Sequence, residues 1–177
     1  FDHVQAARRQ PGSTFKPFVY GAAFANGATP EDTLMDTAVE IPMGGGRVWR
    51  PTDGGPPSDQ PMTLADGLAL SKNTITAQVM QQVGPARVAE VARALGVRQS
   101  KLEEVPSLAL GTSPVTLKEM ISAYSSIVNL GRYVEPVLIT SIEDRHGKVL
   151  ETFAKSVPEE VFQPWAAQTL RLSLIHI

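Results

Sequence analysis

A hydroxyl and an amine that could form one catalytic pair lie close together near the start of the chain. Ser13 and Lys16 are three residues apart in the segment PGSTFKPF, residues 11–18. On a helix, residues at i and i+3 share a face, so the Lys16 amine could take the proton of the Ser13 hydroxyl. The positive end of a helix dipole would disfavour the ammonium form of Lys16 and favour negative charge on the attacking oxygen. The segment therefore predicts a serine nucleophile with a lysine base.

Pro17 also permits an interpretation without catalysis. Proline is favoured in the first turn of a helix, and it pushes the residue before it away from helical backbone angles. On this interpretation the helix begins at Pro17, and Ser13 and Lys16 are ordinary loop residues. Short motifs of common residues arise by chance, so the segment alone leaves both interpretations open.

Composition excludes several kinds of function. The 177 residues are 42% hydrophobic and 19% charged, which is typical of a globular domain or of a piece of a larger one. The net charge of −2 includes no basic surplus, so we expect no nucleic-acid partner. The chain has no cysteine, and its three histidines, His3, His146 and His176, are scattered. We therefore predict no metal site and no cofactor.

Both ends of the chain have the character of a fragment. No apolar run approaches the roughly 20 residues that span a bilayer, and no signal peptide opens the chain. The first residues, FDHV, read like the middle of a protein, so we expect any membrane anchor or export signal to lie before residue 1. Residues 172–177 break the helical pattern of residues 166–171, and we interpret them as a non-native tail on a partial domain at 1–171.

The first third of the chain predicts one buried helix followed by an irregular region. Residues 18–25 are apolar on nearly every side, which is typical of a buried helix, so its N-terminal end would open at a cleft. Residues 28–61 are rich in proline, glycine and aspartate, with short strands expected at Val39–Ile41 and Arg47–Trp49. The glycines at 44–46 lack the ending of a phosphate loop and predict a hairpin turn.

The rest of the chain predicts mainly helices. Caps and glycines mark four of them: one from Thr63 to a break at 71–73, one from Thr74 to Val83, one from Pro85 to Gly96, and one from Thr116 to Gly131. Residues 136–152 then alternate as a hairpin with its turn at 145–148. A last helix is expected to begin near Pro164.

A second motif lies at the break between two of these helices. Ser71-Lys72-Asn73 places a hydroxyl and a carboxamide where both could point into a cleft. Asn73 could equally be the N-cap of the helix that follows, with no part in chemistry. Ser-x-x-Lys before a buried helix, followed by Ser-x-Asn in a helical region, supplies two parts of a known three-part serine active site.

These segments, in this order, resemble the transpeptidase domain of class A (bifunctional) penicillin-binding proteins. Residues 8–20 (RRQPGSTFKPFVY) are similar to that family's nucleophile segment, and residues 61–64 and 68–74 (PMTL and LALSKNT) to its second motif. Residues 108–113 (LALGTS) and 134–136 (VEP) also fall where the family has them. The resemblance covers almost all of residues 1–171. It implies the α+β fold of penicillin-binding proteins and serine β-lactamases, here the helical lobe, the central nucleophile helix, a β-hairpin and an incomplete sheet.

The resemblance implies a D,D-transpeptidase of peptidoglycan synthesis. Ser13 would attack the D-Ala-D-Ala carbonyl of a stem peptide, and its backbone N–H would supply half of an oxyanion hole. Lys16 would be the base, within the first turn of the central helix. Ser71 would relay a proton to the leaving amine, and Asn73 would bind Lys16 and the substrate amide. Lys72, between them, is expected to be a solvated side chain.

The same resemblance sets the partners and the location. Peptidoglycan stem peptides would be substrates, and β-lactams would acylate Ser13 and remain bound. The full-length parent would work on the periplasmic face of the inner membrane of a bacterium, with its glycosyltransferase domain and membrane anchor before residue 1. The family's third motif, Lys-Thr-Gly, does not occur in the 177 residues. We therefore expect the chain alone to be acylated poorly or not at all.

Three other functions remain open on the sequence. A serine β-lactamase would need a deacylating carboxylate, for which Glu103 and Glu104 are the candidates in a plausible region. A monofunctional D,D-carboxypeptidase is disfavoured by Arg9-Gln10 before the nucleophile segment. A non-catalytic β-lactam sensor or wall-binding module could use the same fold, although the intact Lys16 and Ser71 argue against it.

Overall fold

The computed structural model of the chain describes residues 1–153 and 156–175, and its described part is an assembly of helices around one central helix. The helices are α1 (Lys16–Ala25), α2 (Leu64–Ala69), α3 (Asn73–Val83), α4 (Pro85–Leu95), α5 (Leu117–Val128) and α6 (Pro164–Ile175). Two 3-10 helices accompany them, η1 (Gly12–Phe15) and η2 (Pro106–Leu110). No helix in the described ranges is long and apolar enough to cross a bilayer.

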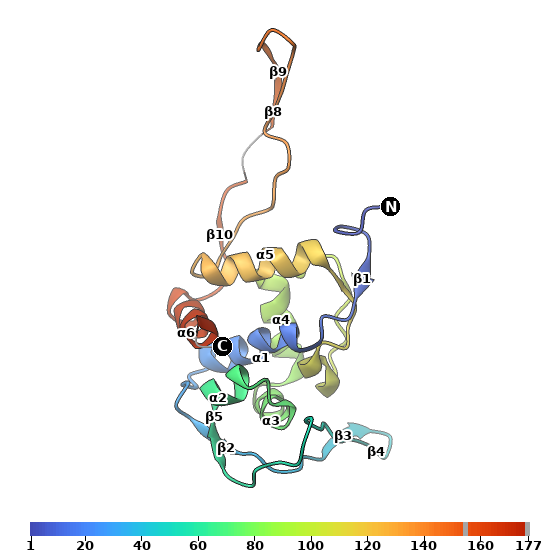
Figure 1. The fold of residues 1–177 in the computed structure, drawn as a ribbon, viewed down its shortest axis with the longest axis vertical. Helices are drawn as coiled ribbons and strands as arrows, with labels where there is room; N and C mark the ends of the chain where they lie inside the picture. The colour runs from blue at the N-terminus through green and yellow to red at the C-terminus, as the bar shows by residue number, and fades with distance from the viewer. Residues whose placement is uncertain (154–155, 176–177) are drawn as a thin grey trace.

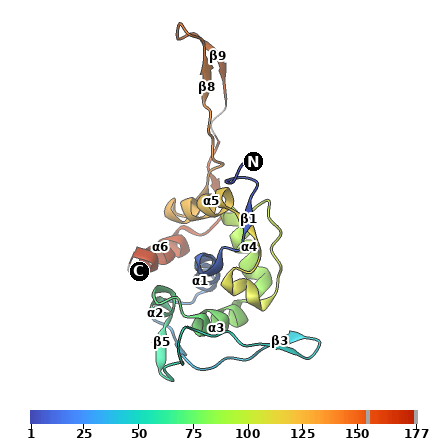
Figure 2. The same cartoon turned by 45° about the vertical axis from the view of Figure 1, so that its right-hand side comes forward.

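The central helix is α1, which packs against α2, α3, α4 and α6 (Figure 2). Every residue from Lys16 to Phe24 is buried, as the uniformly apolar sequence predicts. The close approach of α6 depends on Gly21, because a Cβ there would lie 3.2 Å from a methyl of Leu170. Only Ala25, at the C-terminal end of α1, is partly exposed, while Ser13 and Thr14, which precede the N-terminal end, are exposed.

Strands are short and pair in twos, all antiparallel, without joining into one sheet in the described residues. The pairs are β1 (Arg8–Arg9) with β6 (Val115–Thr116), β2 (Thr33–Met35) with β5 (Pro61–Thr63), β3 (Ile41–Gly44) with β4 (Arg47–Trp49), β7 (Arg132–Tyr133) with β10 (Glu159–Glu160), and β8 (Ser141–Glu143) with β9 (Val149–Thr152). The β8–β9 hairpin extends far from the helical body (Figure 1). The expected α+β class with an incomplete sheet is confirmed.

Most predicted elements are present, with their limits where cap residues put them. Thr116 and Glu119 form a complete capping box at the start of α5. The three glycines at 44–46 all have positive φ and make the predicted β3–β4 turn. The predicted strand at Val39–Ile41 is displaced, because β3 begins only at Ile41. Helix α6 continues to Ile175, so the predicted break in the helical pattern at residue 172 is wrong. Residues 176–177 lie outside the described residues, and the non-native origin of the tail stays a prediction.

Candidate active site

The nucleophile segment forms a tight turn that leads directly into α1. Ser13 lies in η1, and Lys16 is the first residue of α1 with helical angles of φ −53° and ψ −39°. The interpretation that the helix begins at Pro17 is therefore wrong. Phe15 and Lys16 are both buried, and this tertiary packing overrides the local preference of a residue before proline for extended backbone angles. A 3-10 turn has three residues per turn, so Ser13 and Lys16 share a face while Ser13 stays exposed.

Lys16 is buried, with 1% of its surface exposed, and its ammonium joins the two sequence motifs. Its Nζ donates to the side-chain Oγ of Ser71 at 3.0 Å and to Oδ1 of Asn73 at 2.7 Å. It also donates to the backbone carbonyl of Ser71. An ammonium has three protons to donate, and these three acceptors match them. The structure thus brings three of the four predicted site residues into one hydrogen-bonded group.

Ser13, the fourth predicted residue, is joined to Lys16 only through the backbone, where the Lys16 N–H donates to the Ser13 carbonyl. Among the hydrogen bonds of the described residues, none joins the Ser13 hydroxyl to Lys16. The expectation that the Lys16 amine lies over the Ser13 hydroxyl stays a prediction, because in the structure the ammonium is hydrogen-bonded to the second motif. Catalytic hydrogen bonds often tighten only when substrate is bound, so this geometry suits a resting site.

Burial lowers the pKa of Lys16 to about 8, while the negative charge of Asp53 acts in the opposite direction. A lysine with this pKa is about one-tenth neutral at pH 7, against well under a thousandth at the ordinary value. Neutral lysine accepts a proton, so the environment of Lys16 makes it a usable base near neutrality.

The second motif is held in an unusual backbone conformation. Ser71 has a φ of +54°, in the left-handed region that non-glycine residues adopt at a cost. Asn73 is the first residue of α3 rather than its cap, and Lys72 at the cap position makes no side-chain cap bond. The N-cap interpretation of Asn73 is therefore wrong. Its side chain instead accepts from Lys16 and donates to the Thr52 carbonyl at 2.7 Å.

Lys72 is a correction to the sequence-based expectation of a solvated side chain. Its side chain is only 16% exposed, and Nζ lies 2.9 Å from an oxygen of Asp36 and 3.4 Å from one of Asp53. Burial alone would raise the pKa of Asp36, but hydrogen bonds from Lys72, Ser58 and Thr74 outweigh it and hold that pKa well below its usual range. Lys72 therefore serves as the cation of a mostly buried ionic group behind the second motif.

The two aspartates were missed by sequence reasoning. Both lie in the region 28–61, where proline, glycine and aspartate are common and aspartate is ordinarily a turn former. Asp53 accepts the backbone N–H of Asn73 at 2.6 Å, across 20 positions of sequence. No short motif links such distant positions, so only the folded chain connects these residues to the site.

The loop after η2 packs directly on the nucleophile turn. Gly111 has a φ of +66°, and a Cβ there would lie 2.3 Å from the carbonyl oxygen of Gly12. Gln10 donates to the Thr112 carbonyl at 2.9 Å beside this contact. The segment LALGTS is thus placed against the serine turn, and only glycine permits the approach at position 111.

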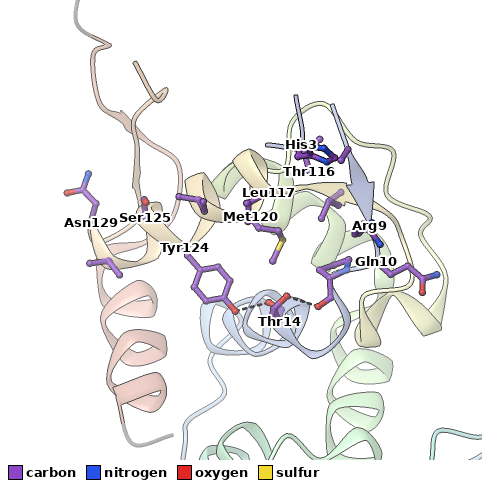
Figure 3. Close-up of a pocket in the computed structure, with 15 residues that line it drawn as sticks. His3, Arg9, Gln10, Thr14, Thr116, Leu117, Met120, Tyr124, Ser125 and Asn129 are labelled. Carbon is purple, nitrogen blue, oxygen red and sulfur yellow. Dashed lines mark hydrogen bonds between the residues drawn. The ribbon is translucent and has the colours of Figure 1, made fainter. Parts of the chain in front are cut away.

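A largely apolar groove of about 1020 Å³ adjoins the same turn on the side of α5. Figure 3 shows Met120 and Tyr124 of α5 facing Gln10 and Thr14 across it. The Tyr124 hydroxyl donates to the Thr14 carbonyl at 2.8 Å and so fixes the turn to α5. The expected opening at the N-terminal end of α1 is therefore present, bounded by the residue that follows Ser13.

The carboxylates that a β-lactamase would need lie elsewhere. Glu104 forms an exposed ion pair with Arg93 at 3.0 Å, and Glu103 is exposed. In the described residues neither side chain has a hydrogen bond with Ser13, Lys16, Ser71 or Asn73.

Known proteins share the sequence pattern and the fold of this chain. The family model described as "Penicillin binding protein transpeptidase domain" matches residues 3–176. Penicillin-binding protein 1A of Rickettsia conorii is 38% identical over 151 residues, which are 85% of this chain and 19% of that protein. The protein of the same name from Neisseria meningitidis is 36% identical over 84% of this chain and 19% of its own length. The chain thus spans about a fifth of the length of these relatives.

Solved structures share the fold. Penicillin-binding protein 1A from Haemophilus influenzae has a TM-score of 0.90 and 28% identity, covering 98% of this chain and 30% of that one. A penicillin G acyl-enzyme complex of penicillin-binding protein A from Mycobacterium tuberculosis has a TM-score of 0.84 at 22% identity, covering 99% and 45%. The family model, the relatives and the shared fold together establish that this chain belongs to the penicillin-binding protein transpeptidase family.

Proposed function

We propose that this chain carries the nucleophile half of a peptidoglycan D,D-transpeptidase site, with Ser13 as nucleophile and Lys16 as base. The observation that supports this most is the buried Lys16 ammonium on Ser71 and Asn73, on the same face as the exposed Ser13. Family membership supports the reaction class, and the whole protein's substrates and location follow as part of the proposal.

Acylation forms one bond to the carbonyl carbon, breaks another, and moves one proton from Ser13 to the leaving amine. Neutral Lys16 takes the proton of the Ser13 hydroxyl as Oγ bonds to the carbonyl carbon of the D-Ala-D-Ala peptide. The bond from that carbon to the terminal D-Ala nitrogen then breaks. The proton on Lys16 passes through the Ser71 hydroxyl, 3.0 Å away, to the leaving amine. An amine from a neighbouring stem peptide would then accept the acyl group and restore Ser13.

The other residues position these groups. Asn73 holds Lys16 through Oδ1. Its amide NH2 donates to the Thr52 carbonyl and would donate to the substrate instead when substrate binds. The backbone N–H of Ser13, at the start of a helix, would stabilise the oxyanion. β-Lactams, which mimic acyl-D-Ala-D-Ala, would acylate Ser13 in the same manner and remain on it.

The whole protein is proposed to act at the bacterial cell envelope, on its periplasmic face, with a glycosyltransferase domain and a membrane anchor preceding these residues. The names of the relatives support an envelope protein. Release of D-Ala from a stem-peptide substrate by the full-length protein, lost in Ser13→Ala, tests the reaction. Bound β-lactam without any D-Ala release would instead identify a non-catalytic sensor.

β-Lactamase activity is a separate outcome that nitrocefin measures. A transpeptidase of this kind is expected to be acylated by nitrocefin and to turn it over very slowly, since in the described part of the chain neither candidate deacylating carboxylate, Glu103 or Glu104, has a hydrogen bond with the predicted site residues. Sustained nitrocefin hydrolysis by the full-length protein would contradict the proposal. The exposure of Glu103 and Glu104, with Glu104 paired to Arg93, supports the transpeptidase.

A further inference from the structure

Asp53 connects an otherwise irregular loop to the second motif. It lies between β4 and β5, and its side chain is 12% exposed. One carboxylate oxygen, Oδ1, accepts the Asn73 backbone N–H at 2.6 Å, and the other lies 3.0 Å from the Thr74 hydroxyl, whose single proton is shared with Asp36 at 2.8 Å. Asp53 therefore holds the first turn of α3, whose first residue carries the oxygen that binds Lys16.

The charges around Asp53 are divided unevenly. Lys72 lies closer to Asp36, at 2.9 Å, than to Asp53, at 3.4 Å. Asp36 also accepts the Ser58 backbone N–H and the Thr74 hydroxyl, so Asp36 and Lys72 form the tighter pair. The carboxylates of Asp36 and Asp53 thus share the single positive charge of Lys72. The group is electrically balanced only when Lys16 is also an ammonium.

We propose that Asp53 is a positioning residue for the reaction of Ser13: it fixes Asn73 against Lys16 and supplies the negative charge that balances the Lys16 ammonium formed when the serine loses its proton. This inference rests on the proposed roles of Ser13 and Lys16. It adds a residue outside the three sequence motifs, and it gives the ionic group behind the second motif a part in the chemistry.

The surroundings of Lys16 agree with this role. Burial lowers the pKa of Lys16, and the Asp53 carboxylate counters that effect. Burial raises the pKa of Asp53, but hydrogen bonds from Asn73 and Thr74 and the Lys72 charge lower it overall, so it is ionised at neutral pH. Tyr20, one turn along α1, bonds to Thr76, and burial raises its pKa, so it is neutral. Among the described residues, Lys72 and its partner Asp36 are the other charged groups that contact Asp53 or its cation.

A variant that removes the charge of Asp53 but keeps the shape of its side chain separates the electrostatic role from a structural one. In Asp53→Asn the side-chain oxygen still accepts the Asn73 N–H, so the turn is kept while the charge is lost. Asp59→Asn is the matched control, because Asp59 lies in the same loop, is exposed, and has a φ of +54° that asparagine tolerates. Both variants remove one negative charge from the chain.

The experiment follows the Lys16 side chain by NMR in the 177-residue chain, with its signal assigned by loss in Lys16→Met. We expect Asp53→Asn to lower the titration midpoint of Lys16 by roughly half a pH unit or more, and Asp59→Asn to leave it unchanged. Lys72→Gln, which removes the competing cation, should move the midpoint in the opposite direction. Equal midpoints for wild type and Asp53→Asn would overturn the proposal. If Asp53→Asn does not fold, Asp53→Ser is measured instead, because it removes the charge and keeps an oxygen that can accept the Asn73 N–H, and an unchanged midpoint would overturn the proposal in the same way.

A second readout uses a longer protein that carries this chain together with a Lys-Thr-Gly strand. The acylation rate by a penicillin should rise with pH as Lys16 becomes neutral. In Asp53→Asn this rise should shift to lower pH, with a plateau reduced several-fold because the base is weaker. If the wild type is not acylated, the proposed function fails, while the Lys16 titration still decides the role of Asp53. An unshifted profile with acylation intact would contradict that role alone.

Discussion

The Nζ of Lys16 lies 2.7 Å from Oδ1 of Asn73, although 57 positions separate the two residues in the chain. This contact joins the end of the central helix to the start of α3, and with the Ser71 hydroxyl it directs the lysine ammonium. The arrangement leads to five predictions that depend on different parts of the structure.

Removing the Asn73 carboxamide should impair acylation more than folding. Asn73→Ala takes one of three acceptors from the Lys16 ammonium and frees the Thr52 carbonyl. In the longer protein we expect the second-order rate of acylation by a penicillin to fall on the order of tenfold to a hundredfold. Asn26→Ala, at the exposed far end of α1, is the control and should react at the wild-type rate. Equal rates for the two variants would remove Asn73 from the site.

A methyl group at Gly111 should disturb the nucleophile turn. Gly111→Ala places a Cβ 2.3 Å from the Gly12 carbonyl oxygen at a positive φ, so it combines backbone strain with a clash. We expect the free energy of unfolding in urea to fall by about 3–5 kcal/mol. Gly147→Ala, where φ is +79° and the space is open, isolates the backbone strain and should cost about 1 kcal/mol. A similar cost for both would mean that the loop does not press on Gly12.

The Lys72 ammonium should stabilise the fold. Lys72→Met leaves the buried Asp36 carboxylate without its nearest cation. We expect a loss of about 3 kcal/mol in the free energy of unfolding, because a buried charge without its partner is costly. Lys148→Met, in the exposed β8–β9 hairpin turn, should change it by less than about 0.5 kcal/mol. If Lys72→Met were as stable as Lys148→Met, the solvated interpretation of Lys72 would be restored.

The same pair predicts how stability depends on pH. Because the folded pKa of Asp36 lies below its ordinary value of 3.8, its carboxylate stabilises the fold above that pH and ceases to do so as the solution becomes more acidic. The difference in unfolding free energy between wild type and Asp36→Asn should therefore be largest near pH 7 and shrink below pH 3.8. Urea unfolding of both proteins at several pH values measures it. A difference that grows in acid would contradict stabilisation of the fold by the Asp36 carboxylate.

The isolated chain should react poorly with β-lactams. It contains no Lys-Thr-Gly, the third motif of the site that the family resemblance implies. After incubation of the 177-residue chain with a penicillin, intact-mass measurement should show little or no adduct. Stoichiometric acylation of Ser13 in this chain would mean that the third motif is dispensable.

The elements that local rules describe were predictable from sequence. The capping box at Thr116 and Glu119 set the start of α5, and Gly96, with a φ of +153°, follows the last residue of α4. The β8–β9 hairpin also has its turn near the predicted residues 145–148, although its strands are shorter than predicted and its register shifts between Ile142 and Glu143. In each case the residues that determine the element lie within a few positions of one another.

What depends on distant contacts was not predictable. The pairing of β2 with β5 joins Thr33 to Thr63 across an irregular region without a strand pattern. Lysine is usually a surface residue, and nothing in the sequence near Lys72 indicates its partners. Only the folded chain brings Asp36 and Asp53 to it. The site residues were identified because their motifs resemble those of a family, while the direction of the Lys16 side chain depends on contacts with residues more than 50 positions away.

The most direct test is to find which residue a penicillin modifies in a longer protein that carries this chain together with a Lys-Thr-Gly strand. Peptide mapping by mass spectrometry after brief incubation should locate one penicilloyl group on the peptide that contains Ser13. The adduct should be absent in Ser13→Ala and form far more slowly in Lys16→Met. An adduct on another residue, or one that persists in Ser13→Ala, would contradict the assignment of Ser13 as the nucleophile.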